Sequence, residues 1–160
     1  MFLETPFPDR ALDLAWYWLQ HDQHANFDDY GPRDFNAFEV EMRRRLAAGE
    51  RTWGVREHRD LVGIIGYLPI TPRLGTFHGI CFDSLVHGSG IPQESVRAVL
   101  AQLWSAGVEK VCASYFMHNL RVHRFLKGIG AIEEGVFRAQ TLQNGKPVDM
   151  RSVALFRGGE

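Results

Sequence analysis

Hydrophobic side chains recur every three to four residues in four segments of the chain, which is the pattern of amphipathic helices. These segments are residues 11–20, 34–48, 92–106 and 119–127. Gly49 follows the second segment, where a helix commonly ends on a left-handed glycine. Pro92 begins the third segment, in a first turn that does not need its missing N–H. We therefore expect four helices at these places.

The remaining hydrophobic runs are rich in β-branched and aromatic residues and predict strands. They cover residues 52–56, 61–70, 76–86, 108–115, 135–143 and 148–156. The first two runs are separated by a short polar segment, residues 57–60, so they are expected to form a hairpin. Asn144 and Gly145 separate the last two runs, and this pair favours a type I′ turn, which needs positive φ at both positions.

The predicted elements follow the order α, α, β, β, β, α, β, α, β, β. Strands joined without a helix pair antiparallel, whereas a strand–helix–strand crossover gives a parallel pair. The expected fold class is therefore α/β (more narrowly α+β), with a mixed, mostly antiparallel central sheet and helices on both faces. A chain of 160 residues without linkers or repeats is expected to form one domain over residues 1–160.

Composition and charge exclude several classes of function. The 18 Lys and Arg balance 19 Asp and Glu, so the net charge of -1 argues against a nucleic-acid-binding protein. No run approaches the roughly 18 apolar residues of a membrane span, and the first residues lack the features of a signal peptide. Cys81 and Cys112 both lie in apolar runs, which is typical of buried thiols in a reducing compartment, so we expect a cytoplasmic protein. His118 and His123 are five residues apart, a poor spacing for two ligands on one helical face, so we expect no metal site.

The segment His87-Gly88-Ser89-Gly90 connects a predicted strand to the third helix. Glycines before a helix allow a tight turn and expose backbone N–H groups at the positive end of the helix dipole, an arrangement that binds phosphate. A simple turn would have the same sequence. Neither common nucleotide motif fits, because Gln93 stands where the dinucleotide fingerprint needs a third glycine and no Gly-Lys-Ser/Thr of a Walker loop is present. A different phosphate-binding protein remains one interpretation.

Several motifs in one order resemble the GCN5-related N-acetyltransferase (GNAT) superfamily over about residues 52–156. The family's acetyl-CoA loop has the pattern Gln/Arg-x-x-Gly-x-Gly/Ala, and the similar segment here is His87-Gly88-Ser89-Gly90-Ile91-Pro92. The branch that acetylates ribosomal-protein N-termini has Asn-x-x-Ser-x-x-x-Leu-x-x-x-Gly-Phe, whose spacing is kept by Asn119, Val122, Leu126 and Gly130. Its Glu-Gly-x-x-Arg is similar to Glu134-Gly135-Val136-Phe137-Arg138.

The resemblance implies an acetyl-CoA site around the glycine loop. The loop residues His87, Gly88, Ser89, Gly90 and Ile91 are expected to hold the pyrophosphate. The family usually polarises the thioester with a backbone N–H of the preceding strand, and Leu85 or Val86 is the expected donor. Asn119 is expected both to cap its helix and to bond the pantetheine arm. Arg124 is a candidate for the CoA phosphates, although a solvated helix face would have the same sequence.

Acetyl transfer to an amine needs a base for the amine and a proton for the departing thiolate. Asp83 is the candidate base, because a carboxylate on an apolar strand would have a raised pKa; a paired or exposed acid is the alternative. His78 lies on the opposite strand face and is the less favoured candidate. Tyr115 is a candidate proton donor, or an aromatic core residue. His118 is a candidate acid or base, or a surface residue.

In the family, the region before the matching motifs covers the acceptor side of the cleft. We therefore divide the expected domain into a helical acceptor-side region, residues 1–50, and an acetyl-CoA-binding core, residues 52–156. The polar stretch of residues 21–33 contributes Phe27 and Tyr30 as candidate pocket aromatics, together with Phe35, for which core packing is the favoured interpretation. Asp28 and Asp29 are placed to attract an amine cation.

The leading hypothesis is thus an acetyl-CoA-dependent N-acetyltransferase that transfers acetyl directly to an amine, either a protein N-terminus or a small amine. Pro92 removes one backbone donor from the loop, and Val122 and Leu126 replace the family's Ser and Tyr. These departures motivate a second hypothesis, a GNAT-fold binding or assembly module that has lost turnover. The oligomeric state does not follow from the sequence.

Overall fold

The computed structural model describes residues 1–20 and 27–159, so His21 and His24 of the polar stretch lie outside the described residues. Within these residues, seven strands form one sheet in the order β1-β2-β3-β4-β5-β7-β6. The strands are β1 (Phe2–Glu4), β2 (Arg51–Glu57), β3 (Asp60–Thr71), β4 (Leu74–Phe82), β5 (Lys110–Phe116), β6 (Ile132–Gln143) and β7 (Lys146–Phe156). Strands β4 and β5 are parallel and the other neighbours are antiparallel, which confirms the expected mixed, mostly antiparallel sheet.

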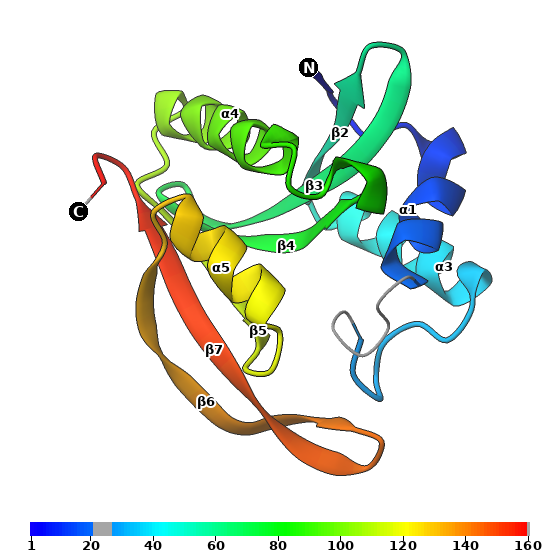
Figure 1. Ribbon diagram of the computed structural model, residues 1–160, viewed down its shortest axis with the longest axis vertical. Coiled ribbons are helices and arrows are strands. Elements are labelled where there is room, and N and C mark those ends of the chain that lie inside the picture. The colour runs from blue at the N-terminus through cyan, green and yellow to red at the C-terminus, as the bar shows by residue number, and fades with distance from the viewer. Residues whose placement is uncertain (21–26, 160) are drawn as a thin grey trace.

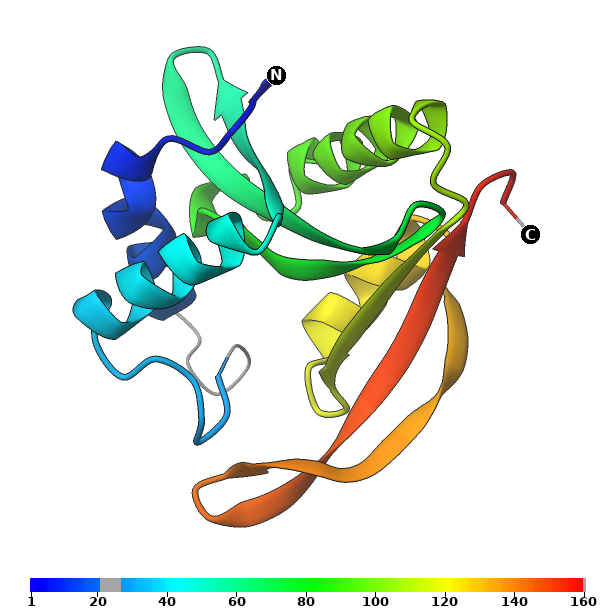
Figure 2. The same cartoon turned by 180° about the vertical axis from the view of Figure 1, so that it is seen from behind.

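Helices cover both faces of the sheet, as Figures 1 and 2 show. They are α1 (Leu12–Gln20) and α3 (Phe35–Ala47) on one face, and α4 (Ile91–Ser105) and α5 (Leu120–Gly128) on the other. Two single-turn 3-10 helices are also present: η1 (Asp9–Ala11) directly precedes α1, and η2 (Ser84–Val86) follows β4. Successive side chains of β3 alternate between the faces: Ile65 joins the hydrophobic cluster under α4, and Ile64 joins the cluster under α1 and α3.

The local signals in the sequence place most element ends correctly. Asp34 caps α3 by accepting a hydrogen bond from the Ala37 backbone N–H at 2.8 Å. Gly49 has φ +95°, the left-handed conformation expected after that helix. Asn144 and Gly145 have φ of 52° and 70°, which fits the expected type I′ turn between β6 and β7.

The observed strands differ from the predicted ones at two places. The strand predicted over residues 76–86 is wrong beyond Phe82, because the Asp83 carboxylate accepts a hydrogen bond from the Leu85 N–H at 2.9 Å and starts η2. A short acidic side chain that accepts a hydrogen bond from the backbone two residues later competes with strand pairing. Because Leu85 and Val86 are apolar, the sequence pattern did not show that the strand ends before them. Strand β1 was missed, since three residues are too few to show an alternating pattern.

The sheet splits between β4 and β5, and this split positions the functional site. The two strands pair only over Leu74–Thr76 and Lys110–Cys112, and then they diverge. Near the start of the split, β4 carries a bulge. Its register with β3 passes from Phe77 opposite Tyr67 to Ile80 opposite Ile65, so His78 and Gly79 together face one residue. Gly79 has φ +98°, a conformation that favours glycine at this position.

Candidate active site

A cleft of about 840 Å³ fills the split between β4 and β5. Trp18 and Leu19 of α1 line it from one face of the sheet, whereas Val122 and Phe125 of α5 line it from the other. The cleft is therefore bounded by elements of both faces. Two molecules that enter from opposite sides can meet in it.

The free edge of β4 forms one wall of the cleft. Residues 79–82 line it, and within the described chain β5 no longer pairs with β4 after Thr76. Backbone N–H groups on such an unpaired edge are available to a ligand oxygen. Leu85 and Val86, the expected donors, lie instead in η2; Leu85 is 89% exposed and Val86 is buried in the core. The cleft is instead lined by residues 79–82 of β4.

The glycine loop adopts the backbone that its sequence requires. Gly88 and Gly90 have φ of +81° and +90°, and a Cβ added at Gly88 would meet no atom within 4 Å. The Ser89 hydroxyl donates to the Val86 carbonyl at 2.8 Å and accepts from the Ile91 N–H at 3.2 Å, so these groups are used inside the loop. Of the described residues, the cleft lining includes His87 and Gly88 but not Ser89, Gly90 or Ile91.

The first turn of α4 brings a residue to the cleft that the sequence analysis missed. Gln93 lines the cleft, and its side-chain Oε1 is buried without a hydrogen-bond partner among the described residues. Buried amide oxygens are normally paired, so this atom is suited to a ligand donor. Its position next to Pro92, just after the glycine loop, was the available signal.

Helix α5 presents polar and cationic groups to the same cleft. Asn119 is buried and accepts a hydrogen bond from the Val122 N–H at 3.1 Å, which confirms its place as the N-cap. Arg124 lines the cleft, as does Arg121, which the sequence analysis did not single out. Because arginine carries a permanent positive charge and several donors, this wall is suited to an anionic group.

Tyr115 lies buried in the cleft wall and is part of a polar network. Its hydroxyl is 2.7 Å from Nδ1 of His123, and an Arg151 guanidinium nitrogen is 2.9 Å from the same atom. Because a guanidinium can only donate, Nδ1 of His123 is an acceptor and the Tyr115 hydroxyl donates to it. Glu133 pairs with Arg151 at 3.3 Å. His123, Arg151 and Glu133 are partners that no local sequence pattern indicated.

Burial raises the pKa of Tyr115, and the hydrogen bond from Arg151 opposes this effect in part. The phenol therefore holds its proton at neutral pH. A protonated phenol in the wall of the cleft is a chemically suitable proton donor.

The two other predicted catalytic residues lie elsewhere. Asp83 is partly buried and caps η2, and His118 is exposed with its ring stacked on Phe116 at 5.5 Å between ring centres. Neither belongs to the lining of the cleft, as far as the described residues define it. The apolar strand environment that motivated Asp83 is absent, because β4 ends before it.

Cys81 lines the cleft but is not available as a nucleophile. Burial raises the pKa of its thiol to about 12, so the reactive thiolate is scarce at neutral pH. Cys81 is buried as expected, whereas Cys112 is only partly buried. A covalent acyl-cysteine step has no support from this thiol.

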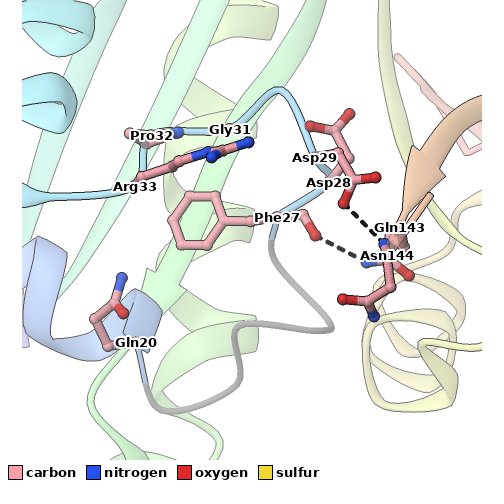
Figure 3. Close-up of a pocket in the computed structure, with 9 residues that line it drawn as sticks. All are labelled: Gln20, Phe27, Asp28, Asp29, Gly31, Pro32, Arg33, Gln143 and Asn144. Atoms are coloured by element: carbon pink, nitrogen blue, oxygen red, sulfur yellow. Dashed lines mark hydrogen bonds between the residues drawn. The ribbon is translucent and has the colours of Figure 1, made fainter.

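A smaller pocket of about 300 Å³ lies between the loop of residues 27–33 and the tip of the β6–β7 hairpin (Figure 3). Both carboxylates expected to attract an amine bind the hairpin. Asp28 accepts from the Thr141 hydroxyl at 2.6 Å, and Asp29 accepts from the backbone N–H groups of Asn144 and Gly145, each at 2.8 Å. Their hydrogen bonds hold the loop against the hairpin tip and place two acidic side chains there.

The expected aromatic residues of this region separate into different environments. Phe27 lines the smaller pocket and contacts the Trp16 ring at 5.8 Å between centres. Tyr30 is exposed. Phe35 packs against the core cluster under α1 and α3, which agrees with the favoured prediction of core packing.

Residues 1–20 and 27–159 contain no group of three His, Cys, Asp or Glu side chains that could hold a metal ion. No helix in the described part of the chain is long and apolar enough to cross a membrane.

Comparisons with known proteins agree with this geometry. No curated protein matches the chain in sequence. Among solved structures, spermidine N-acetyltransferase from Vibrio cholerae in complex with CoA and spermine superposes with a TM-score of 0.82 at 16% identity, covering 99% of this chain and 96% of that one. Ribosomal-protein-alanine N-acetyltransferase from Brucella melitensis gives 0.78 at 13% identity, covering 98% and 100%.

Such low identities show a shared fold. The family model described as "Acetyltransferase (GNAT) domain" matches residues 3–132, which is most of the chain. The chain therefore belongs to the GNAT family of acetyltransferases.

Proposed function

We propose that the protein transfers the acetyl group of acetyl-CoA directly to a primary amine. The observation that carries this proposal is the cleft through the split sheet, bounded by α5 on one face and by α1 on the other. Direct transfer needs both substrates in one site, with the amine nitrogen close to the thioester carbon. A cleft with two sides meets this need without a covalent enzyme intermediate, for which Cys81 offers no thiolate.

The residues of the cleft fit acetyl-CoA. Gly88 leaves open space beside the N-terminus of α4, where phosphate is favoured by the helix dipole. Because Pro92 has no N–H and the Ile91 N–H is bound by Ser89, this loop offers fewer free backbone donors. Arg121 and Arg124 supply positive charge that compensates for them. The unpaired Oε1 of Gln93 offers an acceptor to an amide or hydroxyl of the ligand.

The proposed chemistry uses groups of both strands. When bound, acetyl-CoA supplies an activated acyl group. The backbone N–H groups on the free edge of β4 that point away from β3 stabilise negative charge on an oxygen at the cleft edge. The protonated phenol of Tyr115, on β5, donates a proton to a leaving sulfur.

The acceptor is proposed to be an amine that enters from the α1 and α3 face. The structurally similar proteins named above act on spermidine and on a ribosomal protein. Asp28 and Asp29 place two acidic side chains on that side, and their hydrogen-bond donors there are neutral N–H and O–H groups. Acidic side chains favour a cationic amine over an anionic acceptor.

Thermal unfolding with acetyl-CoA, CoA or ATP tests the proposal first. At about a hundred times its Kd, a ligand stabilises the folded protein by roughly 2.7 kcal/mol. For a chain of this length the expected rise in Tm is roughly 5–11 °C. Acetyl-CoA and CoA should give this rise and ATP should not; a screen of small amines and peptide N-termini then identifies the acceptor. No shift at millimolar acetyl-CoA would contradict the proposal and favour a binding module.

A further inference from the structure

We propose that His78 and Glu50 form the proton-accepting pair of this site, with His78 as the base and Glu50 as its positioning residue. The inference rests on the proposed function, since it assigns the group that takes the proton from the amine. Neither residue lines the cleft as the described residues define it, yet both lie at the point where the sheet splits.

The bulge in β4 determines where His78 lies. His78 comes two residues after Thr76, the last β4 residue paired with β5, and directly before Gly79, which lines the cleft. The neighbouring Phe77 side chain belongs to the cluster under α4, so strand alternation directs His78 to the α1 and α3 face. This is the face from which the amine is proposed to arrive.

Glu50 approaches the same point from the segment between α3 and β2. Its Oε2 lies 3.1 Å from Nδ1 of His78, and the residue is 5% exposed. Gly66 on β3 makes room for it, because a Cβ at Gly66 would lie 2.5 Å from Glu50 Oε1 and 2.6 Å from the His78 carbonyl oxygen. Three separate segments therefore create the contact.

The buried Glu50 carboxylate is only half satisfied by hydrogen bonds. Its Oε1 is buried and has no hydrogen-bond partner among the described residues. A buried carboxylate with an unpaired oxygen destabilises a fold, and an apolar side chain of similar size would avoid this cost. Groups kept at such a cost are commonly found at functional sites.

The contact determines which nitrogen of His78 can accept a proton. A carboxylate only accepts hydrogen bonds, so Nδ1 of His78 donates to Glu50 and carries the ring hydrogen. The free lone pair is then on Nε2. The His78 side chain is 42% exposed, which leaves part of the ring open to an incoming amine. When Nε2 takes a proton, the Glu50 carboxylate stabilises the resulting imidazolium.

The neutral amine nitrogen attacks the thioester carbon, a C–N bond forms and the C–S bond breaks. The proton of the amine goes to Nε2 of His78, and the electron pair of the C–S bond goes to sulfur, which takes a proton from Tyr115. His78 then releases its proton and Tyr115 regains one through solvent. The products are an acetylated amine and free CoA thiol.

Three variants of the full chain test the pair. His78→Ala should lower kcat by roughly 10²–10⁴-fold, the usual contribution of a general base. Its Tm rise with acetyl-CoA should equal that of the wild type, and added imidazole should restore part of the rate. Glu50→Gln should lower kcat less, while its Tm stays the same or rises. His58→Asn, at the exposed β2–β3 turn, is the matched control and should leave kcat unchanged.

The tautomer of His78 can be measured without substrate, and it tests the proposed contact with Glu50 directly. Nitrogen NMR of ¹⁵N-histidine-labelled protein should show His78 protonated at Nδ1 and not at Nε2 when the ring is neutral. The opposite tautomer would overturn the pair. So would a His78→Ala variant with wild-type kcat, or one whose loss is accompanied by a smaller acetyl-CoA shift and is not rescued by imidazole. Failure of acetyl-CoA to stabilise the wild-type protein is a different outcome, which contradicts the proposed function itself.

Discussion

His78 and His123 lie on β4 and on α5, on opposite sides of one split in the sheet, and their Nδ1 atoms have opposite partners. Nδ1 of His78 donates to the buried Glu50 carboxylate, whereas Nδ1 of His123 accepts from the Arg151 guanidinium. The first contact leaves Nε2 of His78 as an acceptor, and the second makes His123 an acceptor for the Tyr115 hydroxyl.

The charge of one distant partner therefore decides whether Nδ1 of a histidine donates or accepts a hydrogen bond. Each partner lies 28 residues away from its histidine along the chain. A carboxylate prepares the ring to take a proton, and a guanidinium prepares it to receive hydrogen bonds from neighbours. In the proposed mechanism, His78 on one side of the split accepts a proton and Tyr115 on the other side donates one, the division of roles that acyl transfer needs.

The strongest test of the donating side is Tyr115→Phe. The substitution keeps the ring in the cleft wall and removes only the hydroxyl that contacts His123. We expect kcat to fall by roughly 10²-fold or more, since general acid catalysis contributes about 10²–10⁴-fold. Steady-state kinetics and the acetyl-CoA-induced rise in Tm are the measurements.

Leu126→Val, a neighbouring change in the cleft that removes no polar group, is the control for lost packing and should cost activity much less. A Tyr115→Phe protein with wild-type kcat would show that the leaving sulfur takes its proton from another source. The two sides of the cleft would then not differ as the contacts of the two histidines suggest.

A smaller effect is expected at the hairpin tip, on the proposed acceptor side. Asp29→Ala removes the acceptor of the hydrogen bonds from the Asn144 and Gly145 N–H groups. Because both bonds are exposed to water, together they contribute about 1 kcal/mol of stability. The loop then loses part of its attachment and the site loses a negative charge. We expect KM for a cationic amine to rise roughly fivefold and KM for acetyl-CoA to stay constant.

The exposed Asp60→Asn variant, at the start of β3, is the matched control for a lost carboxylate. Equal changes in the two KM values of Asp29→Ala would contradict the separation of an acceptor side from a cofactor side. An unchanged amine KM would show that the loop of residues 27–33 is remote from the acceptor.

The smallest expected effect is the pH-dependent contribution of Glu41, on α3, to the free energy of unfolding. Glu41 accepts hydrogen bonds from Arg44 and Arg45, each at 2.9 Å, and these lower its pKa from 4.5 to about 2, the Arg44 bond most strongly. A lowered folded-state pKa stabilises the fold above about pH 4.5, and this contribution is lost as the pH falls toward 2.

Glu41→Gln should therefore reduce stability at neutral pH by less than about 1 kcal/mol, as for other partly exposed ion pairs. The difference from the wild type should disappear at acid pH. Urea unfolding at several pH values measures it. Curves that stay parallel down to acid pH would show that the carboxylate is not stabilised by its arginines in solution.

Much of the fold could be predicted because its signals are local. Hydrophobic periodicity predicted α1, α3, α4 and α5, and single residues such as Gly49 and Asn119 correctly marked helix ends. Of the candidate site, the glycine loop, Asn119, Arg124 and Tyr115 were also singled out, because a motif or a strand end made each of them visible. Their catalytic and binding roles remain predictions.

The remainder depends on contacts between distant segments, which periodicity does not contain. Asp83 lost its apolar strand because its own carboxylate bound the backbone and ended β4 at Phe82. Glu50 and His123 had no local motif, and each reaches its partner only through folding.

The sequence by itself therefore determined the order of helices and strands, most of their ends, and the resemblance to a family, because those properties follow from neighbours along the chain. The tertiary structure decided where the sheet splits, which side chains face the split, and which partner each histidine has. Hydrogen bonds and charges act over a few ångströms in space, and folding alone brings Glu50 to His78 and Arg151 to His123.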